Sequence, residues 1–157
     1  MKKNRFERIQ KTIEDRFIKN LEMLDISSKE RFLETFPSLW KKKKRFEEHV
    51  LKRVKMKHII SSNPKLSYAR KIINVLSDAE DIYIEKKKSG VQVDYVWKRN
   101  WIVIIGENGK IETAYKLETD LQTFLERHKI KNEIYRGKIN EKFRKTVKSL
   151  WNRVELF

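Results

Sequence analysis

The spacing of apolar residues changes twice along this chain, and no other feature constrains the fold as strongly. Up to about residue 78, apolar residues recur every three or four positions, which predicts amphipathic helices. Residues 81–116 alternate instead, and Asn108-Gly109 marks a hairpin, so four consecutive strands are expected there. Helical spacing returns after residue 118. Helices and strands segregated in this way predict an α+β fold with N-terminal helices, a four-stranded antiparallel sheet and a C-terminal helical extension.

The same pattern divides the 157 residues into three regions. Residues 1–36 are expected to be an N-terminal helical extension, 37–117 the compact core, and 118–157 a C-terminal helical extension. This length is enough for one domain with a buried core.

Several classes of protein are excluded by what the sequence lacks. It has no cysteine, which removes a disulfide framework, a cysteine-ligated zinc and a thiol nucleophile. Four scattered glycines are too few for a phosphate-binding loop, and the three histidines are far apart, so neither a metal nor another cofactor is expected. The longest apolar run, residues 101–105, is far short of a membrane span. We therefore expect a cytoplasmic protein with no membrane partner.

The charge of the chain points to a polyanionic partner. There are 38 Lys and Arg against 22 Asp and Glu, a formal net charge of +16, and residues 41–57 alone hold nine basic residues against two glutamates. The alternative is that the charge only solvates a helix face and keeps the protein soluble. The candidate RNA-binding residues are Lys41, Lys42, Lys43, Lys44, Arg45, Lys52, Lys98 and Arg99.

One histidine lies inside this basic segment. Arg45 and Arg53 are four residues before and after His49, so all three project from one side of a helix. The neighbouring cations favour a neutral imidazole, the form that an acid/base catalyst of RNA cleavage would use. The alternative is a structural histidine on the helix surface.

The last predicted strand adds hydroxyl groups. Strict alternation would place Ile111, Thr113 and Tyr115 on one face, where the two hydroxyls could contact phosphate or a base; they could equally be ordinary strand-forming residues. The aromatic residues Trp97 and Trp101 could stack on unpaired bases or pack in the core.

Two short motifs carry a family resemblance. The sequence HVLKRV at residues 49–54 and the sequence GKIETAY at residues 109–115 resemble motifs of the barnase, EndoU, colicin and RelE-like (BECR) nucleases, in particular the members associated with phages and mobile elements. The resemblance covers roughly residues 46–117. It implies a metal-independent ribonuclease with helices packed on an antiparallel sheet. It further implies that His49 and Arg53 on the helix, and Thr113 and Tyr115 on the late strand, are the catalytic residues.

These observations give one leading function and two alternatives. The leading function is an endoribonuclease, typically a toxin acting on transfer or messenger RNA through the 2′-hydroxyl, with an acidic antitoxin or immunity protein as partner. The alternatives are a non-catalytic nucleic-acid-binding or regulatory protein of similar fold, and an adaptor whose basic face binds an acidic protein.

Overall fold

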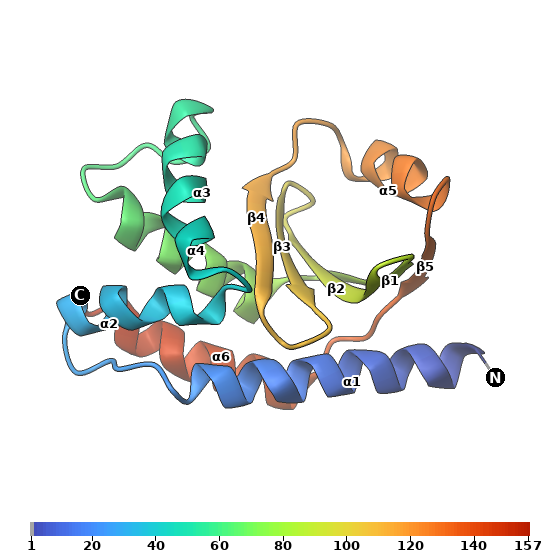
Figure 1. The fold of residues 1–157 in the computed structure, drawn as a ribbon, viewed down its shortest axis with the longest axis horizontal. Coiled ribbons are helices and arrows are strands. Elements are labelled where there is room, and N and C mark those ends of the chain that lie inside the picture. The colour runs from blue at the N-terminus through green and yellow to red at the C-terminus, as the bar shows by residue number, and fades with distance from the viewer. Residues whose placement is uncertain (1) are drawn as a thin grey trace.

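The computed structural model describes residues 2–157, with side chains from Asn4 onward, and confirms the α+β class (Figure 1). Its elements, in chain order, are α1 (Lys2–Leu21), α2 (Lys29–Thr35), η1 (Phe36–Leu39), α3 (Lys43–Lys55), α4 (Pro64–Asp78), β1 (Asp81–Lys87), β2 (Gly90–Trp97), β3 (Trp101–Gly106), β4 (Ile111–Lys116), α5 (Leu121–Lys129), β5 (Glu133–Arg136) and α6 (Glu141–Val154).

The sheet has five antiparallel strands in the order β4-β3-β2-β1-β5, not the four predicted. Strands β1 to β4 form the expected meander. The additional strand β5 pairs with β1, from Tyr83 opposite Arg136 to Lys86 opposite Glu133. Its four residues are too few to show an alternating pattern, and the side chains are at most half-buried, so the sequence carries little sign of this strand.

The two faces of the sheet are covered differently (Figure 1). Helices α1, α4 and α6 cover one face, and their apolar residues form the larger core with it. Phe143 of α6 stacks on Tyr95 of β2 at 5.4 Å, and the Tyr95 hydroxyl donates to the buried Glu14 of α1 at 2.7 Å. Residues from all three regions expected from the sequence therefore share one core, and Trp101 is buried in it.

Of the helices that the structure describes, only α5 packs on the opposite face, and a smaller core of Leu121, Phe124 and Leu125 against Ile102 and Val96 forms there. The rest of this face carries polar side chains and remains partly open. The open part lies next to the edge strand β4.

Strand β4 departs from strict alternation through a bulge. The register shifts between Ile104 and Ile105, so that Ile104 is opposite Thr113 but Ile105 is opposite Ile111. Ile111 is fully buried in the larger core, whereas Thr113 points to the opposite face, so the prediction that these two residues share a face is wrong. The bulge leaves Glu112 and Thr113 facing the same cavity.

Among the described helices, none is both long and apolar enough to cross a lipid bilayer.

Candidate active site

Helix α3 lies beside the edge strand β4 because its two ends are fixed there. Trp40, just before the helix, forms a parallel bridge with Ile111, and the Lys41 N–H donates to the Ile111 carbonyl at 2.9 Å. Near the other end, the Arg53 Nε donates to the Ala114 carbonyl at 2.9 Å. The apolar side of α3 is buried and its basic side remains exposed, so the helix presents its cations along the sheet edge.

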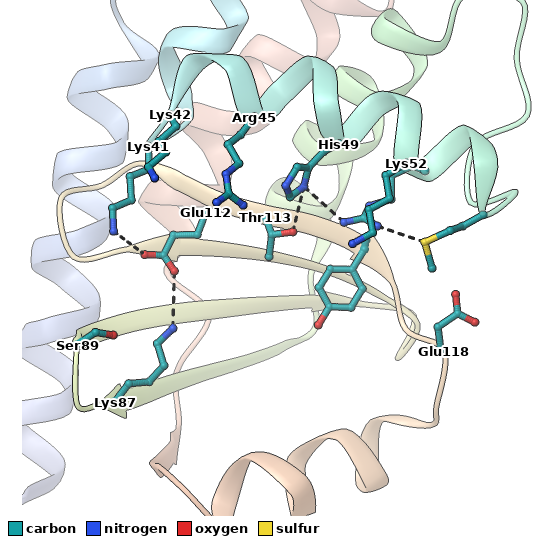
Figure 2. A pocket seen from close by; sticks show the side chains of 13 residues that line it. Lys41, Lys42, Arg45, His49, Lys52, Lys87, Ser89, Glu112, Thr113 and Glu118 are labelled. Carbon is teal, nitrogen blue, oxygen red and sulfur yellow. Dashed lines mark hydrogen bonds and ion pairs between the residues drawn. The ribbon is translucent and has the colours of Figure 1, made fainter.

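The basic side of α3 and β4 enclose a cavity of about 670 Å³ (Figure 2). Figure 2 shows His49 on α3 pointing across to Thr113 on β4, with the cations of α3 on either side. The lining residues are Lys41, Lys42, Arg45, His49, Lys52, Arg53, Met56, Lys87, Ser89, Glu112, Thr113, Tyr115 and Glu118.

His49 is the centre of this arrangement. Its Nδ1 lies 3.3 Å from the Thr113 Oγ1 and 3.5 Å from an Arg53 terminal nitrogen, and its ring packs edge-on against Trp40 with centroids 5.0 Å apart. A guanidinium can only donate, so Nδ1 must accept and the neutral ring carries its proton on Nε2. The Thr113 hydroxyl can then donate to the same nitrogen.

The surroundings of His49 keep its ring neutral. Burial is the largest cause, and the positive charges of Arg53, Arg45 and Lys52 add to it, lowering the pKa of His49 from 6.5 to about 4. This agrees with the neutral imidazole expected from the sequence.

Arg53 is the most unusual charged group of the site. Its residue is 4% exposed, and no Asp or Glu of residues 4–157 forms an ion pair with it. Its contacts include the Ala114 carbonyl, His49, the Met56 sulfur at 3.6 Å and the face of Tyr115, whose centroid is 5.3 Å from Cζ. A buried cation is costly without an anion. The guanidinium lines the cavity, so an anion bound there would offset its charge.

At the end of the cavity formed by Lys41 and Lys87, the carboxylate of Glu112 lies near both lysines. It lies 3.7 Å from Lys41 and 3.9 Å from Lys87, and it passes over Gly106, where a Cβ would come within 2.6 Å of its Oε1. Figure 2 shows this carboxylate between the two lysines. Glu112 thus pairs with the two lysines. Arg45, Lys52 and Arg53 form no ion pair with a carboxylate among the described side chains.

The structure thus brings together eight of the twelve candidate residues. His49, Arg53, Thr113 and Tyr115 line the cavity together with Lys41, Lys42, Arg45 and Lys52. The remaining four do not line it, namely Lys43, Lys44, Lys98 and Arg99. Sequence reasoning missed Glu112, because strict alternation would have turned it away, and Lys87, whose run of three lysines was visible but could not be placed.

The cavity combines a neutral acid/base group, a hydroxyl that can pass a proton to it, and cations without anionic partners. That set of groups can bind a phosphodiester and move protons at its oxygens. Within residues 4–157, no three His, Asp or Glu side chains are placed to hold a metal ion together.

Comparison with known proteins gives a family but no activity. No curated protein and no solved structure matches the chain. Residues 30–155, which include α3, the whole sheet and the whole of α6, match the family described as uncharacterised protein aq_aa01, and the chain belongs to that family.

Proposed function

We propose that this protein is a metal-independent endoribonuclease that cleaves through the 2′-hydroxyl. The observation that carries the proposal is the buried guanidinium of Arg53, which has no carboxylate partner among residues 4–157 and lies beside a neutral histidine. A phosphodiester would supply the missing anion, and its reacting oxygens would lie next to the only acid/base histidine of the cavity. The motifs that resemble BECR nucleases contain the same two residues.

The proton path follows from the tautomer of His49. The 2′-hydroxyl gives its proton to the Thr113 Oγ1, which passes its own proton to the His49 Nδ1. The 2′-oxygen then bonds to phosphorus, the bond from phosphorus to the 5′-oxygen breaks, and the leaving oxygen takes the proton from Nε2. The products are a 2′,3′-cyclic phosphate and a free 5′-hydroxyl, and His49 ends neutral. Arg53, Arg45 and Lys52 hold the charge that develops on the phosphate.

The test is incubation of the purified protein with total RNA in excess chelator. Wild type is expected to cleave, and His49→Ala is expected to lose activity by about 10²- to 10⁴-fold, the usual contribution of a general acid or base. Leu51→Ala is the matched control, because Leu51 lies on the same helix and is 72% exposed away from the cavity. Intact RNA with wild type, or equal cleavage by His49→Ala, would reject the proposal.

A non-catalytic RNA-binding protein is the second candidate, and the low pKa of His49 favours it. A nitrogen with a pKa of about 4 is a weak proton acceptor at neutral pH. A bound phosphate would raise that pKa by offsetting the surrounding cations, which is what the catalytic proposal requires. Tight, salt-sensitive RNA binding without cleavage would support the second candidate.

We further propose that the protein acts as a toxin on transfer or messenger RNA and is held inactive in the cytoplasm by an acidic antitoxin or immunity protein. The support is the exposed row of cations along the cavity, which an acidic partner could cover. Expression of wild type is expected to arrest growth, whereas expression of His49→Ala is not. Normal growth with wild type at the same protein level would reject the toxin role.

A further inference from the structure

A second group of cations gathers around Trp97, outside the cavity. Lys71 of α4 and Lys98 of the β2–β3 turn place their ammonium groups 4.9 and 4.5 Å from the Trp97 ring centroid. Lys116, at the end of β4, is opposite Trp101 in the ladder, and the Lys71 ammonium lies 5.5 Å from that ring. We call these residues, with Arg99, the Trp97 patch.

The cations of the Trp97 patch are not held in ion pairs. Across residues 4–157, none of its four cations forms an ion pair. Three acidic residues on the adjoining segments lie nearby without pairing with a side chain of the patch: Glu80 accepts the backbone N–H of Lys98, Asp120 accepts the N–H of Thr123 at the start of α5 and interacts electrostatically with Arg99, and Glu118 pairs with His58 at 2.6 Å.

The lysines are close enough to repel one another. The pKa of Lys71 is lowered, mainly by burial and further by the charges of Lys98 and Lys116. An indole ring attracts an ammonium group without cancelling its charge, as a carboxylate would. Trp97 therefore holds two cations in place and leaves their charge available to a ligand.

The backbone of the β2–β3 turn, which carries two of these cations, is strained. Lys98 and Arg99 are both left-handed, with φ of 50° and 60°, and the turn is closed by the Asn100 N–H donating to the Trp97 carbonyl at 3.1 Å. Turns with two left-handed central residues strongly favour Asn and Gly. Basic residues here carry a conformational cost that the fold itself does not explain, and such strain is typical of functional sites.

The Trp97 patch is adjacent to one end of the cavity. Glu118, which lines the cavity, pairs with His58, whose ring packs edge-on against Trp101 at 6.2 Å. The β2–β3 turn and the end of β4 lie at the same end of the meander, opposite the Lys87 end of the cavity. A nucleic-acid strand that leaves the cavity past Glu118 would reach the patch next.

We propose that the Trp97 patch is a second phosphate-binding site, which holds the RNA strand beyond the scissile nucleotide through Lys71, Lys98, Arg99 and Lys116. The inference rests on the proposed RNA substrate but not on its cleavage. It predicts that long RNA binds through both sites, whereas a very short RNA binds only in the cavity.

The test measures binding of 2′-O-methyl RNA, which has no attacking hydroxyl, by fluorescence anisotropy at several salt concentrations. The patch variant combines Lys71→Gln, Lys98→Gln and Lys116→Gln. The control variant combines Lys129→Gln, Lys131→Gln and Lys145→Gln, three exposed lysines that carry the same charge but line none of the cavities described. Both retain the catalytic residues.

With a 20-mer, the patch variant is expected to lose at least about ten-fold in affinity beyond the control, and its salt dependence should weaken by roughly 0.7 per lost contact. A trinucleotide should bind all three proteins equally. Equal losses of RNA affinity in the patch and control variants would overturn the proposal. So would a loss of affinity for a poly-glutamate peptide as large as the loss for RNA, because that result would assign the patch to an acidic protein. The single variant Lys98→Gln, exposed on the turn, replaces the triple variant if the latter does not fold.

The result is separable from the proposed function. Patch-dependent binding by a protein that never cleaves RNA keeps the second site and rejects the nuclease. Normal cleavage with no effect of the patch keeps the nuclease and rejects the second site.

Discussion

Two buried charged sites lie on the same face of the sheet, and they are satisfied in opposite ways. Glu85, fully buried on β1, is held by His128 at 2.7 Å, Asn132 at 2.7 Å and Gln92 at 3.1 Å. Arg53 is almost as deeply buried, but no carboxylate of residues 4–157 forms an ion pair with it. The first site is complete within the protein and fastens α5 to the sheet, whereas the second would be completed by the phosphate of the proposed substrate.

The Glu85 site also contains a second carboxyl group. Asp94 is fully buried next to Glu85 and shares Gln92 with it, at 2.8 Å. Burial raises the pKa of Asp94 well above its usual range, and the negative charge of Glu85 contributes in the same direction, whereas, against the effect of burial, the pKa of Glu85 is lowered by its hydrogen bonds. The surroundings therefore favour the protonated form at Asp94 and the ionised form at Glu85, which faces His128.

The largest expected effect comes from removing the ligand-dependent charge. Arg53→Leu should lower RNA cleavage by about 10²- to 10³-fold, the usual loss when one group that stabilises developing charge is removed. Arg144→Leu is the matched control, because Arg144 also donates its Nε to a backbone carbonyl, that of Ser77 at 2.9 Å, but lies away from the cavity. Single-turnover rates measure the difference. Similar losses in both variants would show that Arg53 is structural.

Replacing Glu85, the buried carboxylate that the protein itself satisfies, should lower stability and leave RNA cleavage unchanged. Glu85→Gln is expected to reduce the free energy of unfolding by about 1–3 kcal/mol, since His128 and Asn132 lose a charged acceptor. Cleavage by the folded protein should be unchanged. Chemical denaturation and the single-turnover rate together give the two values, and a loss of rate without a loss of stability would contradict the comparison.

Asp94→Asn separates the two carboxyl groups. Because the folded pKa of Asp94 is raised, its contribution to stability is present at low pH and is lost as the pH rises through the folded pKa. The amide cannot ionise, so the variant should lose stability less than wild type on going to high pH. A denaturation series from about pH 4 upward measures this, because the two proteins should begin to differ at the ordinary aspartate pKa of 3.8, and equal slopes would show that folding does not raise the pKa of Asp94.

Part of the Arg53 site could be predicted from the sequence, and the part that could not has a physical cause. The placement of His49 between two arginines needed only helical spacing. The structure places Thr113, the expected partner, beside His49 although the face argument was wrong, because the bulge that moved Ile111 into the core leaves Thr113 facing the cavity. The bulge arises from how β4 pairs with β3, which no local pattern in β4 reveals.

The buried site under α5 was not predicted at all. Glu85, Asp94 and His128 are separated in the sequence, and the alternation of β1 and β2 marks their carboxylates as solvent-exposed. They are buried because α5 returns over this face after β4, and the short strand β5 then closes the sheet edge beside it. Such tertiary coverage decides burial, and it cannot be read from residues 81–95 alone.

The pH dependence of RNA cleavage should show how far the cations of the Arg53 site lower the pKa of His49. As a proton acceptor His49 must be neutral, so kcat/KM is expected to fall only as the pH drops through about 4, instead of through its ordinary value of 6.5. On the acidic side, kcat should fall at a higher pH than kcat/KM does, because bound phosphate offsets the charge of the cations around His49. Coincident limbs near 6.5 would show that the cations do not act on His49 in the free protein.

The same shift affects stability, with a defined sign. The folded pKa of His49 is below the unfolded one, so between about pH 4 and 6.5 the unfolded chain binds more protons. Stability should therefore rise with pH across this window, and His49→Asn should reduce the slope. Denaturation of both proteins at matched pH values checks this, with Lys98→Gln as a control of unchanged slope.

The smallest expected effect concerns the carboxylate between the cavity and the Trp97 patch. Glu118 is 66% exposed at its side chain and pairs with His58, so its charge is largely solvated. If an RNA strand passes over it, Glu118→Gln should raise the affinity for a 20-mer of 2′-O-methyl RNA by roughly two- to five-fold at low salt, within the range of one exposed charge pair. The gain should vanish at high salt through screening, and the affinity for a trinucleotide should change less. An unchanged affinity for the 20-mer at low salt would show that the strand does not pass over Glu118. The Arg53 cavity would then bind its anion without a contribution from the Trp97 patch.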